Sequence, residues 1–180
     1  MSKTIKAVAI AAVSALSLNA SASELTFGIS EHVVSADLKS YLNEHTNLEA
    51  GYIYSDKKGH LAEFAMHMVH QTGPHTIEVG PKWSSVWFDN NPNGSVISVG
   101  GHYSLALNNN LSLHGDAYYA PSVLSFSNVD GYTELGAKVK YSFNPNMALF
   151  VGYRNLTFKY DDRSDRSFDD GFYIGGTAKF

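Results

Sequence analysis

Four polar residues in the middle of the chain carry side chains that could form a hydrolytic centre. His102 and Ser104 lie two residues apart, and His114 and Asp116 are spaced in the same way. If the asparagines at 108–110 close a hairpin, Ser104 faces His114 across the two strands. The same register places His102 beside Asp116. A base beside a hydroxyl and an acid beside an imidazole are the ingredients of an activated serine nucleophile.

The segments that carry these residues alternate between apolar and polar side chains. From Tyr132 to Phe143 nearly every second residue is apolar, with polar residues or glycines between them. A period of two predicts a strand with one apolar face. Strands are expected at residues 25–33, 36–43, 48–55, 61–70, 75–88, 95–107, 111–120, 132–143, 147–160 and 172–180. Ten strands are therefore predicted; eight remain the alternative, because the segment around 33–45 could form a loop.

The first 22 residues have the organisation of an export signal. Two lysines precede about a dozen apolar residues, and Ala20 and Ala22 supply small side chains at the cleavage positions. The apolar stretch is too short to span a membrane, which takes ~20 residues. We therefore expect cleavage after Ala22, with residues 1–22 removed and residues 23–180 forming one exported domain.

The turns and the aromatic residues distinguish a membrane barrel from a soluble periplasmic sandwich, which is the rival fold. Short turns at 71–74, 108–110 and 144–146 alternate with longer polar segments at 55–60, 89–94, 122–131 and 161–171. Aromatic side chains are interpreted as membrane girdles and anchors at Trp83, Trp87, Phe88, Tyr118, Tyr119, Tyr141, Phe143, Tyr153, Phe158 and Tyr160. This layout predicts an all-β, antiparallel, up-and-down transmembrane β-barrel in the bacterial outer membrane.

Hairpin arithmetic places opposite charges inside this barrel. If the turn at 71–74 closes a hairpin in which the numbers of paired residues sum to 145, Glu63 pairs with Lys82. It also pairs His67 with Glu78, and such cross-strand pairs are stabilising. The expected polar network of the lumen comprises Glu63, Lys82, His67, Glu78, His102, Asp116, Ser104, His114, Glu134, Lys138, Lys140, Arg154 and Lys179.

The turn at 144–146 gives the same test on the outer face. Its closure pairs residues whose numbers sum to 290, so Val139 lies beside Val151 and Tyr141 beside Leu149. A shift of one residue would move every one of these apolar side chains into the lumen. The agreement of the faces therefore supports this register.

The candidate hydrolytic residues also fit a structural role, because a narrow barrel needs its inward-facing charges to be paired. The spacing of His102 and Ser104 is similar to the His-x-Ser of outer-membrane lipid A deacylases. The pair His114 and Asp116 is similar to the His and acid of omptin proteases. Those enzymes act near the outer rim, whereas these residues face inward in the periplasmic half. We therefore expect a self-satisfied network and no catalytic or cofactor site.

The end of the chain has the pattern of an assembly signal. Tyr173 takes the polar position, Gly175 the glycine, and Ala178 and Phe180 the two hydrophobic positions of the terminal strand that outer-membrane insertion machinery reads. The expected partners are the barrel-assembly machinery during insertion, and outer-membrane lipid and lipopolysaccharide afterwards. The protein is expected to be a monomer.

The exported chain resembles the YfaZ family of small outer-membrane proteins. The resemblance is carried by HGDAYYAPSVLS at 114–125, by Gly136-Ala137, by VGYRNL at 151–156 and by GFYIG at 171–175. Upstream of Leu111 the likeness is one of pattern and spacing. The resemblance implies a small outer-membrane barrel of unestablished activity and supplies no catalytic residues.

Composition excludes several classes of function. There is no Cys, which rules out disulfides, thiolate zinc sites and cysteine nucleophiles. His70 and His75 flank a turn, but two histidines are fewer than the ligands a zinc site needs, so no metal site is expected. Without Lys3 and Lys6 the chain has 11 basic and 17 acidic residues, a net charge of −6 that disfavours nucleic acid.

The size of the barrel limits what it can do. Eight to ten strands enclose an interior that side chains roughly fill, so bulk diffusion is not expected. The leading hypothesis is a non-catalytic barrel with an envelope-structural or surface-interaction role. A narrow channel or small-ligand-binding barrel is the alternative, and a lipid A hydrolase or protease is third.

Overall fold

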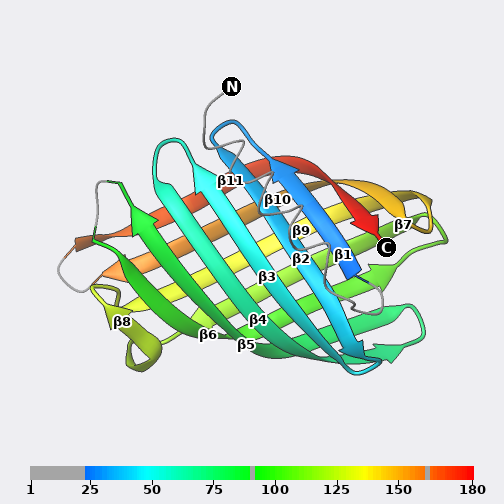
Figure 1. Cartoon of the computed structure of the whole chain (residues 1–180), viewed down its shortest axis with the longest axis horizontal. Helices are drawn as coiled ribbons and strands as arrows, with labels where there is room; N and C mark the ends of the chain where they lie inside the picture. Colours follow the sequence, from blue (N-terminus) through cyan, green and yellow to red (C-terminus); the bar gives the residue numbers. More distant parts are fainter. Residues whose placement is uncertain (1–22, 90–91, 161–162) are drawn as a thin grey trace.

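Ten long strands close into one antiparallel barrel within residues 23–89, 92–160 and 163–180, which the computed structural model describes (Figure 1). The strands are β1 (Ser23–Ile29), β2 (Val33–Asn43), β3 (Thr46–Ser55), β4 (Gly59–Thr72), β5 (His75–Phe88), β6 (Gly94–Ala106), β7 (Leu111–Ala120), β9 (Gly131–Asn144), β10 (Met147–Tyr160) and β11 (Arg163–Lys179). The predicted all-β fold and the count of ten are confirmed.

Two small elements lie between β7 and β9. They are the 3-10 turn η2 (Ser122–Leu124) and the short strand β8 (Ser125–Ser127), which pairs with the start of β6. Among the described residues, no helix is long and apolar enough to cross a membrane.

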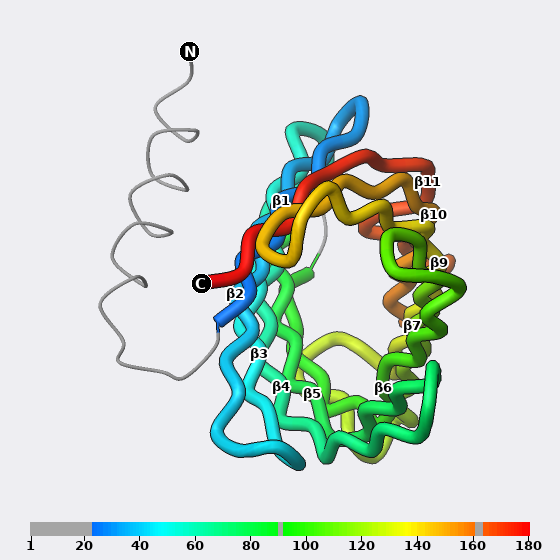
Figure 2. Tube along the Cα trace, turned by 90° about the vertical axis from the view of Figure 1, so that its right-hand side faces the viewer, coloured from blue at the N-terminus to red at the C-terminus, as the bar shows by residue number. Residues whose placement is uncertain are grey.

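The first and last strands pair with each other and close the barrel. The backbone N–H of Ser23 donates to the carbonyl of Phe180 at 2.8 Å, and the N–H of Phe180 donates back at 2.9 Å. Figure 2 shows the strands arranged around a common axis, with both ends of the described chain near one rim. We call this rim, which also carries the turns after β2, β4, β6 and β9, the turn rim, and the opposite one the loop rim.

Two of the three predicted registers are confirmed. In the hairpin of β9 and β10, Val139 faces Val151 and Tyr141 faces Leu149. In the hairpin of β6 and β7, Ser104 faces His114, and His102 likewise faces Asp116.

The predicted register of β4 and β5 is wrong by two residues. The turn consists of Gly73 and Pro74 alone, with Gly73 at a φ of 57°, so Thr72 faces His75. As a result Lys82 faces Ala65, and neither Glu63 with Lys82 nor His67 with Glu78 is a directly opposed pair. A shift of two residues leaves every side chain on its expected face, because the side-chain period of a strand is two.

β2 and β11 extend further toward the loop rim than predicted, whereas β1 ends earlier than predicted. β11 begins at Arg163, so most of the segment 161–171 that was expected to be a loop is strand. A bulge in β11 makes Phe168 an extra residue, because Leu156 pairs with Asp169 while Thr157 pairs with Ser167. The bulge lets both Phe168 and Asp169 point into the barrel, where both are buried. At the other end of the chain β1 stops at Ile29, and β2 begins three residues before the expected position, at Val33.

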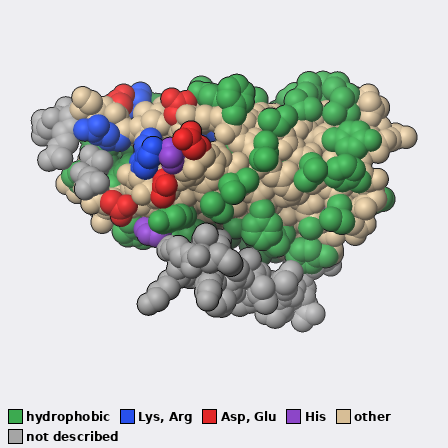
Figure 3. Space-filling view, turned by 90° about the horizontal axis from the view of Figure 1, so that it is seen from above, with side chains coloured by type: hydrophobic (Ala, Val, Ile, Leu, Met, Phe, Trp, Pro, Cys, Tyr) green, Lys and Arg blue, Asp and Glu red, His purple; other side chains and the backbone are tan. Residues whose placement is uncertain are grey.

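The outer wall is covered by exposed apolar side chains. Hydrophobic residues cover much of the face in Figure 3, while charged side chains gather near one end. The exposed large residues include Phe64, Met68, Trp83, Trp87, Val99, Tyr119, Leu135, Tyr141, Phe143, Leu149, Val151, Tyr153, Phe172 and Ile174. A belt of this extent is typical of a surface that contacts lipid.

Four of the expected girdle residues point inward instead. Phe88, Tyr118, Phe158 and Tyr160 are buried in the barrel, with at most 8% of each residue exposed. In β10 the alternation places Leu156, Phe158 and Tyr160 on the inner face, on the same side as Arg154. The inner face becomes apolar at the loop rim, so an apolar side chain there does not mark the lipid side.

These inward-facing residues form a hydrophobic core inside the loop half of the barrel. The core consists of Val33, Ile53, Leu61, Val86, Phe88, Val96, Tyr118, Ala120, Val129, Tyr132, Leu156, Phe158, Tyr160 and Phe168. Val129 reaches it from the segment between β8 and β9. The barrel is therefore packed with apolar side chains at one end.

Candidate functional site

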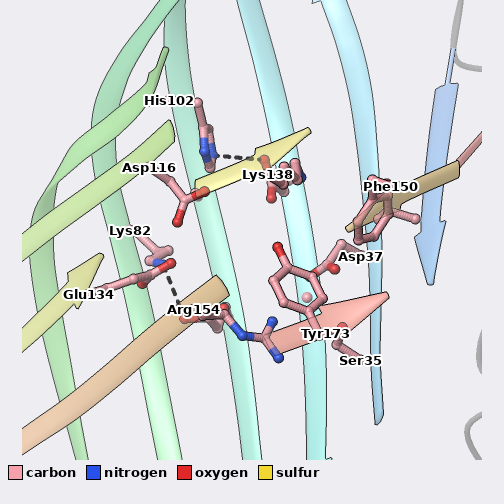
Figure 4. Close-up of a pocket in the computed structure, with 15 residues that line it drawn as sticks. Ser35, Asp37, Lys82, His102, Asp116, Glu134, Lys138, Phe150, Arg154 and Tyr173 are labelled. Carbon is pink, nitrogen blue, oxygen red and sulfur yellow. Dashed lines mark hydrogen bonds and ion pairs between the residues drawn. The ribbon is translucent and has the colours of Figure 1, made fainter. Parts of the chain in front are cut away.

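The half of the lumen toward the turn rim is polar and contains two cavities. The larger has a volume of about 230 Å³ and the smaller, nearer the middle of the barrel, about 70 Å³. Both are lined by Thr26, Asp37, Glu49, His102, Asp116 and Lys138. Figure 4 shows the smaller cavity, with His102 and Asp116 among the side chains that surround it.

The structure places the thirteen residues of the expected network in the lumen. Twelve line one cavity or the other, and His67 is fully buried behind them, in contact with Tyr118. Sequence reasoning missed Glu24, Asp37, Lys39, Asn47, Tyr118, Tyr132, Asp169 and Tyr173, which also belong to the network. The alternation of β2, whose outward residues are Val34, Ala36, Leu38 and Leu42, could have found Asp37 and Lys39.

Lys82 is the centre of an ion-pair cluster in the middle of the barrel. Its ammonium group lies 3.2 Å from Glu63 and donates a hydrogen bond to Glu134, which lies beside it in Figure 4. It also lies 4.0 Å from the ring centre of Tyr118, and the hydroxyl of Tyr132 donates to Glu134 at 2.6 Å. One buried cation thus compensates two carboxylates, with no water needed between them.

Arg154 connects the last two strands. Its Nε and Nη2 atoms both donate to Oδ2 of Asp169, at 2.9 and 2.7 Å. Its guanidinium group also lies 4.9 Å from the ring centre of Tyr173. The two side chains lie next to each other in Figure 4. Asp169 points inward by alternation with Tyr173, and the bulge in β11 follows directly at Phe168, on the side of the loop rim.

Two further clusters lie closer to the turn rim. Lys39 donates to Glu78 at 2.7 Å and lies 3.4 Å from Glu49. Lys140 and Lys179 each lie 3.4 Å from Glu24, which belongs to the first strand. Charges from both ends of the chain therefore meet where the barrel closes.

The candidate hydrolytic residues do not assemble a catalytic triad. Ser104 Oγ lies 2.7 Å from Nδ1 of His114, as the register requires. The second ring nitrogen of His114 contacts the hydroxyl of Ser112 at 2.8 Å, and no carboxylate bonds to this imidazole among the described residues. His102 faces Asp116 on the neighbouring strand, but its Nε2 contacts Tyr118 at 3.0 Å and lies 3.4 Å from Glu49. The base that contacts Ser104 and the acid that faces His102 therefore do not meet at one imidazole.

A different set of residues has the composition of a metal site. Ligand atoms of Glu49, His67 and His102 all lie within 4.8 Å of one another. The two turn histidines do not join them, since His70 contacts Thr72 and His75 contacts Tyr103. The three residues come from β3, β4 and β6, so their spacing along the chain does not indicate a shared site.

Solved outer-membrane proteins share the barrel fold. The NanC porin superimposes with a TM-score of 0.50 at 10% identity, covering 87% of this chain and 98% of its own. A bacterial polysaccharide outer membrane secretin gives a TM-score of 0.51 at 15% identity over 86% of this chain. This chain spans 57% of the secretin chain. At such identities the likeness concerns the fold alone.

Sequence relatives are more specific. A family model described as YfaZ precursor matches residues 1–180. Outer membrane protein YfaZ of Escherichia coli (strain K12) is 31% identical over 139 residues, which cover 74% of each chain. The description as a precursor agrees with an export signal, although the expected cleavage after Ala22 lies outside the described residues. The protein is an outer-membrane β-barrel, and the chain belongs to the YfaZ family.

Proposed function

We propose that this protein is a closed, non-catalytic barrel with an envelope-structural or surface-interaction role. The observation that carries the proposal is the hydrophobic core in the loop half of the lumen. Leu61, Val86, Val96, Phe158 and Phe168 are all fully buried there. Water and ions would have to pass among these packed side chains, and an apolar constriction opposes both.

The orientation in the membrane follows from the rims. Bacterial outer-membrane barrels have short periplasmic turns and longer extracellular loops. The turn rim, which carries both ends of the described chain, would then face the periplasm. The apolar core closes the barrel toward the outside, and the charged cavity opens toward the periplasm.

The polar contacts of the lumen support a role without catalysis. The imidazole of His114 is held between two hydroxyl groups, those of Ser104 and Ser112. A serine nucleophile is activated by a base that a third, acidic group orients. Ser104→Ala should leave any turnover of lipid A or peptide unchanged, and a hydrolytic product that disappears in this variant would contradict the proposal.

Conductance in planar bilayers tests the closed barrel directly. The refolded protein, checked by a heat-dependent shift on a gel, is added to a bilayer beside a reconstituted general porin as the positive control. We expect insertion without stepwise current, and no swelling of vesicles in isotonic sugar. Regular open events of uniform size in the folded protein would overturn the proposal and favour a narrow channel.

A second candidate function, binding of a small polar ligand, is favoured by the larger cavity. Five carboxylates and four lysines line it, so it offers both signs of charge at short range. A zwitterion the size of an amino acid matches this lining and a volume of about 230 Å³. A saturable rise in the unfolding temperature with free amino acids would support this function. No shift with any of them would exclude it.

A further inference from the structure

Three side chains, those of Glu49, His67 and His102, lie close together inside the barrel. The ion-pair clusters described above do not account for the positions of all three. His67 is fully buried, and the side chains of Glu49 and His102 are 22% and 23% exposed toward the lumen. Both of the latter line the larger cavity, so a solute that enters from the turn rim reaches them. Two imidazoles and one carboxylate form a set of ligands that zinc uses in proteins.

A chain of hydrogen bonds holds His67 in the orientation of a ligand. Lys39 donates to Glu78, and the amide nitrogen of Asn47 donates to the same carboxylate at 3.0 Å. The amide oxygen of Asn47 therefore faces Nδ1 of His67, at 3.0 Å. Because an amide oxygen can only accept, the proton of the neutral ring lies on Nδ1. The lone pair of Nε2 then points into the cluster.

Metal-binding histidines are usually oriented in this way. The ring nitrogen that does not bind the ion donates its proton to a carboxylate, a carbonyl or a water molecule, which fixes the tautomer. In this barrel the amide of Asn47 takes that place, and Glu78 and Lys39 fix the amide in turn. The network therefore prepares one ligand atom of His67 before any ion arrives.

Glu49 provides a second, independent observation. Its Oε2 atom is buried and has no hydrogen-bond partner among the described residues. Lys39 and His102 lie 3.4 Å from this oxygen, close enough for attraction but without a hydrogen bond. A buried carboxylate oxygen without a hydrogen bond is costly, and a cation coordinated to it removes that cost.

Tyr118 completes the arrangement. Its hydroxyl lies 2.6 Å from Nε2 of His67 and 3.0 Å from Nε2 of His102. The hydroxyl proton is directed at the lone pair of His67, so His102 donates its own proton to the hydroxyl oxygen. Transfer of that proton to Nδ1, the other tautomer of the neutral ring, frees the Nε2 lone pair of His102 for a metal ion.

We propose that Glu49, His67 and His102 bind one divalent transition-metal ion, with Zn²⁺ as the best match. Imidazole ligands favour zinc, copper and nickel over calcium and magnesium, which prefer sets of oxygen ligands. Solvent from the larger cavity supplies the remaining coordination, and the Tyr118 hydroxyl gives up its contacts with the two Nε2 atoms when the ion binds. The occupied site would tie β3, β4 and β6 together across the lumen.

Zinc titration of the folded, untagged protein in detergent tests the proposal. The protein is first dialysed against a chelator, and zinc is then added while binding is followed by calorimetry. We expect one ion per chain, and absorption bands of a four- or five-coordinate site when Co²⁺ replaces zinc. Uptake of no ion, or equal uptake of calcium, would overturn the proposal.

Variants separate the proposed site from adventitious binding. His67→Ala, His102→Ala and Glu49→Gln should each abolish stoichiometric binding, and the last keeps the shape of the side chain. Asn47→Ala, which removes only the group that orients His67, should weaken binding by about 10- to 100-fold. His75→Ala, at an exposed turn, is the matched control and should bind normally. Loss of binding in His75→Ala, or its retention in both His67→Ala and His102→Ala, would refute the site.

Discussion

Replacement of Lys82 by methionine should strongly destabilise the barrel. The side chain of Lys82 is 7% exposed, and its partners Glu63 and Glu134 are 12% and 8% exposed. Methionine keeps most of the length of the aliphatic side chain, but it removes the positive charge and the ammonium group that lies over the ring of Tyr118. Two buried carboxylates would then face each other with no cation between them.

The magnitude follows from the burial of all three groups. Removal of one partner of a buried ion pair costs about 3–5 kcal/mol, because the remaining charge has lost its compensation. That range corresponds to a change of roughly a hundredfold to a few thousandfold in the unfolding equilibrium. An exposed pair would be worth at most about 1 kcal/mol.

Unfolding in guanidinium chloride, with the protein in lipid vesicles, measures this change. Trp83 and Trp87 face outward, so their fluorescence reports the loss of the lipid environment. The matched control is Lys159→Met, which removes an exposed lysine from β10 and should be nearly neutral. Adding Glu134→Gln to Lys82→Met should restore part of the lost stability.

One outcome would refute the reasoning. If Lys82→Met unfolds with the same free energy as Lys159→Met, within about 1 kcal/mol, the cluster does not behave as a desolvated ion pair. The same conclusion would follow if Glu134→Gln made the Lys82→Met protein less stable.

Three further predictions concern packing and assembly. Gly175→Ala should destabilise the barrel by about 1–3 kcal/mol in the same denaturant assay, because its new methyl group would lie 2.0 Å from a backbone oxygen. Gly171→Ala should be neutral, because no atom of the described residues, other than those of its chain neighbours, lies within 4 Å of its new methyl group. Phe158→Ala should cost about 3–5 kcal/mol by opening a cavity in the apolar core, and the lipid-facing Phe143→Ala much less, so equal midpoints for these two variants would contradict the assignment of the core. Phe180→Ser should lower the amount of heat-modifiable barrel in outer-membrane fractions, if the end of β11 is the assembly signal; normal accumulation would show that the terminal aromatic residue is not read.

The alternation of apolar and polar side chains, together with the short turns, was sufficient to predict the wall of this barrel. The ten strands follow from alternation, and the pairings of Val139 with Val151 and of Ser104 with His114 follow from turns with one plausible closure. The turn of β4 and β5 allowed two closures, since Gly73 and Pro74 follow two polar residues. Both closures keep the same faces, so the alternation could not distinguish between them.

The loop half of the barrel could not be predicted in the same way. There the inner face is as apolar as the outer one, as Leu156, Phe158 and Tyr160 show. Hydrophobicity then no longer indicates which side faces lipid. The bulge at Phe168 is a second reason why this half could not be predicted. One extra residue makes two consecutive side chains point inward and interrupts the alternation.

The sequence by itself determined that the chain is exported, that it forms a β-barrel and which side chains line most of its lumen, because these properties depend on local order along each strand. Only the tertiary structure decided which end of the lumen is packed with apolar side chains and which polar groups meet inside it. Glu49, His67 and His102 are brought together from three strands. Contacts across the lumen depend on the stagger and closure of the whole barrel, which no local period encodes.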